Sequence, residues 1–433
     1  MSIFSLDSVH ANYLDCWLEL SRSLLPETSN QPALSMPYQR WFKFKEAFAP
    51  AFVVDTIRAL PYEPRHCLDP FGGSGTTALT CQFLGIGSTT IETNPFLADL
   101  IESKLISYDI GQLRQTFRQV IRRAKKRKLS ARTVNHSFPG SPRTFVEPGD
   151  GERWVFNREV AEAVLALRSE IDQVDDPTCR RFLRVMLGCR LIEVSNVVVN
   201  GKGRRYRSSW KKRSVTSRDV FAAFEEACLI GFADIESFRR RRQSDYAVLR
   251  GDSRELIKQC KSADFILTSP PYPNSFDYTD IYNVELWALG YLTSSIDNRN
   301  LRERTLRSHV QIAHGNGITE CASPVLRSTY RTLVRNRDKL WNPRIPEMIC
   351  LYFEDLERVL KGCRAVLRKG GYVVMALGNS RYAGVVIDVP RILCDLIESL
   401  GFELVKKKSV RSMRASSQQG GREVLTESLL WLK

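Results

Sequence analysis

The sequence lacks the cysteine pattern of a metal-binding or disulfide-stabilised protein. Its 11 cysteines form no Cys-x-x-Cys pair, and their spacing matches no set of zinc ligands. Several of them, such as Cys67 and Cys350, lie beside apolar residues, where a buried free thiol is the usual arrangement. We therefore expect no metal site and no disulfides, and a reducing cytoplasm as the location.

Long apolar runs are also missing. No stretch approaches the roughly 18 consecutive apolar residues of a membrane-spanning helix. The first residues contain no positively charged segment followed by an apolar one, so we expect neither secretion nor membrane insertion. The signatures G-x-x-x-x-G-K-[ST] and G-x-G-x-x-G are absent as well, which disfavours a nucleoside triphosphate site and a nicotinamide dehydrogenase.

Positive charge, by contrast, is abundant and unevenly spread. The formal net charge is +16, and residues 105–245 contain 29 lysines and arginines against 17 acidic residues. Most of the excess therefore lies in this segment, in the runs Arg122–Lys128, Lys202–Arg213 and Arg239–Arg242. Such an excess of basic residues indicates a polyanionic partner.

The hydrophobic pattern divides the chain into two α/β parts and a helical part between them. Residues 1–104 alternate between helices and strands, with expected helices at 49–60 and 76–84 and expected strands at 66–69 and 88–92. Residues 105–245 have helical periodicity and polar loops without strand alternation, which predicts a basic, mainly helical insertion. Its expected helices span 111–128, 158–171, 178–194 and 217–242.

The alternation of strands and helices resumes in residues 246–433. A buried strand is expected at 263–267, helices at 352–367 and 389–400, and a last strand at 425–432. Residues 294–346 form an irregular, arginine-bearing stretch inside this part. The chain is thus expected to be one α/β domain, in two halves, interrupted by the insertion.

A glycine-rich turn, Phe71-Gly72-Gly73-Ser74-Gly75, follows the first predicted strand. Glycines at a strand-to-helix turn let the backbone approach a ligand closely, and the start of the helix favours negative charge. Glu92 ends the next strand, where a carboxylate can accept hydrogen bonds from both hydroxyls of a ribose. Turn and carboxylate together predict a site for a cofactor that contains a ribose.

The segment Thr268-Ser269-Pro270-Pro271-Tyr272 closes the buried strand at 263–267. Two consecutive prolines remove two backbone donors and leave nearby carbonyls free to accept from a ligand. An exocyclic base amine is a poor nucleophile because its lone pair is delocalised into the ring. We expect Ser269 Oγ and the Pro270 carbonyl to hold the two N–H groups of such an amine, and Tyr272 to stack on a flipped base. A purely structural proline-rich turn is the alternative.

These motifs resemble those of the amino-methyltransferase family of DNA methyltransferases, which modify N4 of cytosine or N6 of adenine. The family has an F-x-G-x-G turn, a strand-end acid and a [DNS]-P-P-[YF] tetrad, matched here by Phe71–Gly75, Glu92 and Ser269–Tyr272. An upstream phenylalanine segment is matched at Phe48, and Gly251-Asp252-Ser253 resembles the third cofactor motif. The resemblance covers roughly residues 38–102 and 246–433.

The resemblance implies an α/β, Rossmann-like S-adenosylmethionine-dependent methyltransferase fold with a largely helical basic insertion. It implies S-adenosylmethionine as the cofactor and catalytic roles for Ser269, Pro270, Pro271 and Tyr272. The residues expected to bind the cofactor are Phe48, Asp69, Phe71, Gly72, Gly73, Gly75, Glu92, Asp252 and Thr268.

Serine at the first tetrad position resembles the cytosine-N4 members, so we expect site-specific methylation of N4 of cytosine in DNA. Methylation of adenine N6 is the alternative, and methylation of RNA or of a protein glutamine is less favoured because of the basic insertion and the serine. A catalytically inactive DNA-binding module is disfavoured by the intact motifs. No Pro-Cys dipeptide is present, so we expect direct transfer without a covalent bond between enzyme and base.

Double-stranded DNA is the expected partner, and a cognate restriction endonuclease is a further one. In the run Lys202–Arg213, basic residues are interleaved with Tyr206 and Trp210, a pattern typical of nucleic-acid-binding surfaces. Residues 294–346 are the next candidate for reading bases. The expected DNA contacts are Lys202, Arg204, Arg205, Arg207, Lys211 and Lys212.

Overall fold

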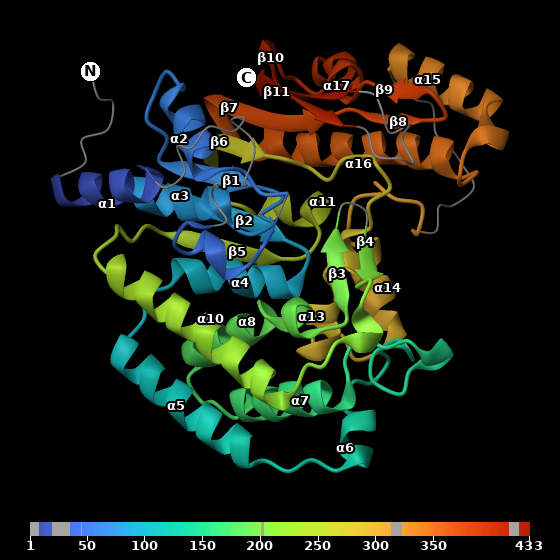
Figure 1. Cartoon of the computed structure of the whole chain (residues 1–433). Helices are drawn as coiled ribbons and strands as arrows, with labels where there is room; N and C mark the ends of the chain where they lie inside the picture. The colour runs from blue at the N-terminus through green and yellow to red at the C-terminus, as the bar shows by residue number, and fades with distance from the viewer. Residues whose placement is uncertain (1–7, 20–34, 45, 201–202, 313–322, 415–423) are drawn as a thin grey trace.

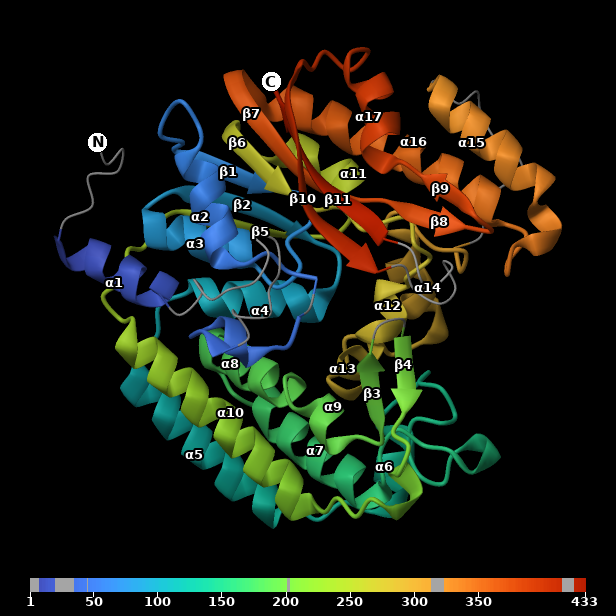
Figure 2. The same cartoon turned by 45° about the horizontal axis from the view of Figure 1, so that its top comes forward.

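The computed structural model describes residues 8–19, 35–44, 46–200, 203–312, 323–414 and 424–433. Its centre is a seven-stranded sheet in the order β10-β11-β7-β6-β1-β2-β5, with helices on both faces (Figure 1, Figure 2). Strand β11 pairs antiparallel with β7 and β10, and the other pairs in the sheet are parallel. The strands are β1 (His66–Asp69), β2 (Gly87–Glu92), β5 (Tyr246–Arg250), β6 (Ala263–Thr268), β7 (Leu367–Gly378), β10 (Leu404–Arg414) and β11 (Val424–Leu432).

The strand order reverses at the centre of the sheet. From β1 the chain moves outward through β2 to β5, and then returns to build the other half from β6. Ligands of open α/β sheets bind at such a reversal, beyond the carboxyl ends of the strands. Asp69 ends β1 and Thr268 ends β6, so the two principal motifs meet at this point. This order, with one reversed strand near the edge, is that of the Rossmann-like methyltransferases, and the predicted fold class is confirmed.

Alternating residues of the central strands face two separate cores. Cys67, Phe265 and Leu267 belong to the core beneath the first group of helices, which also contains residues of the insertion. Leu68 and Ile266 belong to the core beneath the second group. Period-two burial of this kind is what a strand covered on both faces requires. The first group contains α2 (Pro50–Arg58), α3 (Thr76–Leu84) and α4 (Pro95–Leu105), with α1 (Ser8–Glu19) against α3, and the second contains α11 (Ser253–Leu256), α16 (Ile345–Val366) and α17 (Val389–Ile397).

The insertion packs on α4 through α8, and its helices lie below the sheet in Figure 1. Its helices are α5 (Ile110–Lys126), α6 (Ala131–His136), α7 (Arg158–Asp172), α8 (Pro177–Gly188), α9 (Leu191–Val194) and α10 (Ser217–Ser237). Two expectations were wrong in detail. The helix expected at 178–194 is broken into α8 and α9, and the segment taken as a loop at 200–209 contains the strand β4 (Gly203–Tyr206), which pairs with β3 (Val197–Asn200).

The second half contains more regular structure than its sequence indicates. Helix α16 begins at Ile345, seven residues before the expected start, because Pro346 fits the first turn of a helix. The edge strand β10 was not predicted. None of the helices within the described ranges is both long and apolar enough to cross a lipid bilayer. The remaining elements are α12 (Tyr278–Ile281), α13 (Asn283–Ala288), α14 (Ser295–Glu303), α15 (Pro324–Arg335), β8 (Ser380–Tyr382), β9 (Val385–Ile387) and short 3₁₀ helices at Gln39–Trp41, Asp150–Glu152, Trp210–Lys212, Ile257–Gln259 and Arg337–Lys339.

Candidate active site

A cavity of about 330 Å³ opens beyond the carboxyl ends of β1, β2 and β6. Most of the site residues expected from the sequence line it together. Gly75 and Thr268 do not line it: Gly75 precedes α3, and Thr268 is buried at the end of β6. The expected residues in the lining are Phe48, Asp69, Phe71, Gly72, Gly73, Glu92, Asp252, Ser269, Pro270, Pro271 and Tyr272.

The glycine turn requires glycine for steric reasons. Gly73 and Gly75 have φ values of 53° and 80°, in the left-handed region that other residues rarely adopt. A Cβ atom on Gly72 would lie 2.2 Å from Thr90 Cγ2, so that position has no room for a side chain. The turn therefore presents bare backbone to the cavity.

Lys104 supports the turn from behind and was not predicted. Its fully buried Nζ donates to the Ser74 carbonyl at 2.7 Å, and burial lowers the pKa of its amine to about 7. In the sequence, Lys104 is a single lysine within the apolar helix α4. Such a lysine looks like an ordinary surface residue. Its role depends on a contact that the fold alone creates.

Two backbone N–H groups hold the carboxylate of Glu92 in place. Oε2 accepts from the Gly73 N–H and Oε1 from the Asn94 N–H, both at 2.7 Å. Burial raises the pKa of the Glu92 carboxyl to about 7, although these two hydrogen bonds oppose the rise. A carboxylate has about four acceptor positions, so about two stay open for the hydroxyls of a ribose.

Asp69 and Asp252 also line the cavity. Asp69 Oδ1 accepts from the Phe71 N–H at 3.0 Å, and burial raises the pKa of the Asp69 carboxyl to about 6. Asp252 caps α11 and pairs with Arg254 at 2.7 Å, while the Ser253 hydroxyl donates to the Pro70 carbonyl. Each carboxylate is thus held in one orientation by protein groups.

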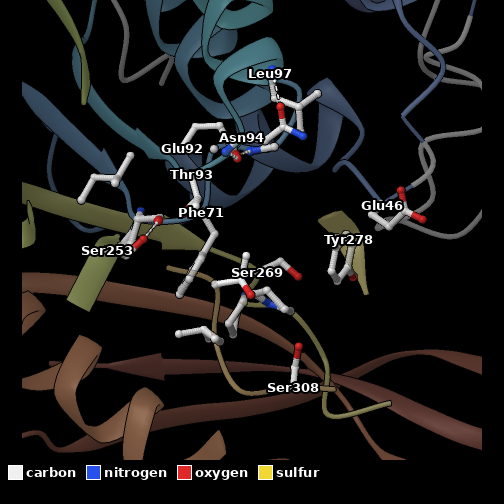
Figure 3. Close-up of a pocket in the computed structure, with 18 of the residues that line it drawn as sticks. Glu46, Phe71, Glu92, Thr93, Asn94, Leu97, Ser253, Ser269, Tyr278 and Ser308 are labelled. Carbon is white, nitrogen blue, oxygen red and sulfur yellow. Dashed lines mark hydrogen bonds between the residues drawn. The ribbon is translucent and has the colours of Figure 1, made fainter. Parts of the chain in front are cut away.

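The residues present fit S-adenosylmethionine. In Figure 3, Glu92, Thr93 and Asn94 lie at one end of the cavity, above Phe71 and Ser253, and Ser269 lies beyond Phe71. Glu92 offers acceptors for the ribose, and the glycine turn offers exposed backbone for the amino-acid part of the molecule. When bound, S-adenosylmethionine supplies an electrophilic methyl group on its sulfonium. Glu92 and the glycine turn would hold this molecule in the cavity that Ser269 also lines.

The loop Ser269–Pro273 is held by hydrogen bonds to the antiparallel end of the sheet and to the segment around Tyr382. Tyr272 Oη donates to Glu427 Oε1 at 2.5 Å, and Tyr382 Oη donates to the Pro273 carbonyl at 2.9 Å. Glu427 is only 3% exposed and lines the cavity from β11. Sequence reasoning missed it, although an acidic residue in the middle of an apolar strand was a usable signal.

Aromatic residues also line the cavity, and of these the sequence singled out Phe48 but not Phe44, Tyr278 or Tyr282. The ring of Phe44 stacks on Tyr282 with centroids 5.3 Å apart, and Tyr282 Oη donates to Glu46 Oε2 at 2.9 Å. Phe48 packs on Phe52 with centroids 4.9 Å apart. Tyr278 also faces the cavity (Figure 3). These residues come from segments far apart in the chain, and no spacing motif connects them.

The basic run Lys202–Arg213 contains both residues that bond within the protein and residues that are exposed. Arg204 Nη1 donates to Asn283 Oδ1 at 2.5 Å, which joins the β3–β4 hairpin to α13. Arg207 Nη2 donates to the Ile192 carbonyl at 2.9 Å, so this guanidinium serves the fold of the insertion. Lys202 lies outside the described residues. The expected DNA contacts that are exposed are Arg205, Lys211 and Lys212.

The run Arg239–Arg242 is partly internal as well. Arg241 is buried, and its guanidinium donates to Gln82 Oε1 at 3.0 Å and to the Lys104 carbonyl at 2.6 Å. The number of basic residues in the sequence is therefore larger than the number of basic side chains on the surface. A guanidinium with five donors often satisfies buried carbonyls, and its charge pattern in the sequence is the same in either role.

Comparison with known proteins finds relatives that match almost the whole chain. The chain is 27% identical to type II methyltransferase M.AvaI of Nostoc sp., over 96% of the chain and 89% of the relative. It is 21% identical to M.BsoBI of Geobacillus stearothermophilus, over 94% and 87% of the two chains. The chain is a homologue of the type II methyltransferases. The resemblance to DNA methyltransferases is thereby confirmed, and S-adenosylmethionine is the cofactor of this methyltransferase.

Other matches are either shorter or weaker. M.MjaII of Methanocaldococcus jannaschii is 39% identical over 49% of this chain and 54% of the relative, and no family model matches. Among solved structures, TrmN from Thermus thermophilus aligns with a TM-score of 0.29 and 12% identity, over 89% of this chain and 49% of that one. The rRNA methyltransferase aviRa from Streptomyces viridochromogenes aligns with a TM-score of 0.27 and 10% identity, over 100% and 94%. Within the described residues of this methyltransferase, no group of His, Cys, Asp and Glu is arranged to hold a metal ion.

Proposed function

We propose that this methyltransferase transfers the methyl group of S-adenosylmethionine to N4 of cytosine at specific sites in double-stranded DNA. The observation that carries the proposal is the shared cavity, which places the Ser269–Tyr272 loop beside the glycine turn and Glu92. The serine of this loop favours cytosine over adenine. The homology to type II methyltransferases supports DNA as the substrate.

The catalytic loop would act by orienting the amine. Ser269 Oγ and the Pro270 carbonyl accept its two N–H groups, which directs the nitrogen lone pair toward the methyl donor. Positioning of this kind converts an encounter of two molecules into an effectively unimolecular step. The methylated nitrogen is acidic enough to pass its extra proton to water, so no strong base is required. Tyr272, held by Glu427, supplies a ring on which the flipped base stacks.

Analysis of the modified nucleoside tests the choice of base. Duplex DNA methylated by the purified protein is digested to nucleosides and separated by chromatography with mass detection. N4-methyldeoxycytidine is expected, identified against a standard because 5-methyldeoxycytidine has the same mass. Only N6-methyldeoxyadenosine in the digest would contradict the choice of cytosine, and methylated RNA or protein alone would contradict DNA as the substrate.

Cofactor affinity should depend on pH through Glu92. The ionised carboxylate accepts both ribose hydroxyls, and burial places its pKa near 7 in the free protein. The dissociation constant of S-adenosylmethionine should therefore rise as pH falls from about 8 to 6, approaching tenfold per pH unit below the pKa. Calorimetry with wild type and Glu92→Gln measures this, and the variant should bind weakly at every pH. The same pH dependence in both proteins would assign it to another group.

The exposed residues of the insertion are proposed to contact DNA phosphates. Changing Arg205, Lys211 and Lys212 to glutamine should reduce DNA affinity and make its dependence on salt shallower. The slope of log affinity against log salt should fall by about one for each phosphate contact that the substitutions remove. Binding titrations over a range of salt concentrations measure the slope. The charge-matched control changes Lys406, Lys407 and Lys408, which are exposed on the edge strand β10; equal slopes in the two variants would place the DNA surface elsewhere.

A further inference from the structure

Two hydroxyl groups face Ser269 from the other side of the cavity. In Figure 3, the ring of Tyr278 lies across the cavity from Ser269, and the Ser308 hydroxyl points into the space between them. Neither hydroxyl has a hydrogen-bond partner among the residues that the structure describes. Ser308 is only 1% exposed as a residue, and the surface that it keeps lies in the lining of the cavity. Hydroxyls that line a cavity and have no protein partner are free to donate to a ligand bound there.

Both side chains are held in place by their surroundings. Asp277 caps α12 by accepting from the Thr279 N–H at 3.0 Å, and Arg302 Nε donates to its other oxygen at 2.9 Å. The ring of Phe276 packs edge-on against Tyr278, with centroids 4.7 Å apart. These contacts fix the start of helix α12, which carries Tyr278.

Ser308 lies on a segment that is fixed just as firmly. Its carbonyl accepts from the Ser275 N–H at 2.9 Å, which joins it to the catalytic loop. The neighbouring Arg307 pairs with the buried Asp355 at 2.6 Å. The two hydroxyls are therefore preorganised, as donors for a specific ligand must be.

We infer that Tyr278 and Ser308 bind the ring edge of the flipped base and determine that the base is cytosine, an inference that rests on the proposed function. Beside its exocyclic amine, cytosine presents two adjacent acceptors, N3 and O2. Adenine presents one acceptor, N1, followed by a C–H group. Two donors opposite the amine-binding loop match cytosine and leave one donor unpaired with adenine. An unpaired buried donor is what gives a polar pocket its discrimination.

Burial keeps the phenol in the donating form. It raises the pKa of Tyr278 well above its ordinary value, and the nearby Glu46 adds to the rise. The hydroxyl therefore stays protonated at any working pH. A neutral donor suits N3 of cytosine, which is an acceptor in the unprotonated base.

A cycle of variants and base analogues tests the inference. Tyr278→Phe and Ser308→Ala are compared with wild type on duplexes that carry cytosine or 3-deazacytosine at the mapped target position. Each variant should lower kcat/KM on cytosine by about 10- to 100-fold. Removal of N3 should cost wild type a similar factor, and it should cost nothing further in the variant whose hydroxyl contacts N3.

Controls separate this role from a structural one. S-adenosylmethionine affinity and the melting temperature should be unchanged in both variants, and Tyr13→Phe, which removes a phenol on α1, should behave as wild type. Near-normal kcat/KM in both variants, or the full 3-deaza penalty in both, overturns the inference while cytosine methylation by wild type stands. A wild-type protein that makes no N4-methylcytosine contradicts the proposed function itself, before any variant is compared.

Discussion

Replacing Ser269 by alanine should lower the turnover number by roughly 30- to 1000-fold, equivalent to about 2–4 kcal/mol of transition-state stabilisation. The interaction matters most when the amine nitrogen becomes tetrahedral, because its N–H groups then point at Ser269 Oγ and the Pro270 carbonyl. The dissociation constants for S-adenosylmethionine and DNA should stay near their wild-type values. Single-turnover kinetics with saturating DNA and cofactor separates these quantities.

Tyr272→Ala is the informative comparison for Ser269→Ala. A stacking platform also holds the flipped base in the ground state, so its loss should reduce flipping as well as slow transfer. Fluorescence of 2-aminopurine at the target position should be lower with Tyr272→Ala and unchanged with Ser269→Ala. Normal turnover in Ser269→Ala together with normal flipping in Tyr272→Ala would mean that the loop is structural.

Gly73→Arg should weaken S-adenosylmethionine binding by at least about 100-fold, a loss of about 3 kcal/mol. Even a Cβ atom there would lie 3.0 Å from Phe44 Cε1, and a long side chain would enter the cavity in front of Glu92. The positive φ of 53° adds strain for any residue other than glycine. Isothermal titration calorimetry measures the dissociation constant directly.

A matched control isolates the effect of the cavity from that of backbone strain. Gly370 has a φ of 80° and open space where a Cβ would lie, and it does not line the cavity. Gly370→Arg should therefore cost stability, as seen in the melting temperature, and leave cofactor affinity intact. Equal loss of affinity in both variants would attribute the loss to misfolding, and unchanged affinity in Gly73→Arg would place the cofactor elsewhere.

The parts of the fold that were predicted from the sequence are those with strong local signals. Strands β1 and β6 are short apolar runs that end in motifs, and the residues after them must lie at one edge of a parallel sheet. That rule predicts that Gly73 and Ser269 lie close together, and both residues line the same cavity. The fold and the principal motifs follow from local pattern together with this one topological rule.

The strands that were not predicted are β10, β3 and β4, and the sequence around each of them explains why. Strand β10 contains Lys406, Lys407 and Lys408, and charged residues of this kind are typical of an exposed edge strand but hide its periodicity. Strand β4 (Gly203–Tyr206) is polar and begins with a glycine, so it resembles a loop, whereas the β-branched run Val197–Val199 of its partner β3 was a usable signal. Strands β10 and β4 are stable because of their neighbours, which a local pattern does not contain.

The contacts between distant segments were beyond sequence reasoning. Arg204, an expected DNA contact, hydrogen-bonds Asn283, and the sequence does not reveal this contact because basic residues look alike whether they serve phosphate or a buried acceptor. Tyr278, Ser308 and Glu427 come from three separate segments, and only the folded chain brings them to the same cavity. These residues surround the space where the base is proposed to lie.

Transfer of a labelled methyl group tests the central claim most directly. The purified protein is incubated with S-adenosylmethionine labelled in the methyl group and an equal mixture of duplex DNA, structured RNA and soluble protein, and the label in each fraction is counted. The proposed function predicts label in the DNA fraction alone, released on digestion as a methylated cytosine nucleoside, and strongly reduced label with Ser269→Ala. Label in RNA or protein and not in DNA, or equal labelling of DNA by wild type and Ser269→Ala, would contradict it.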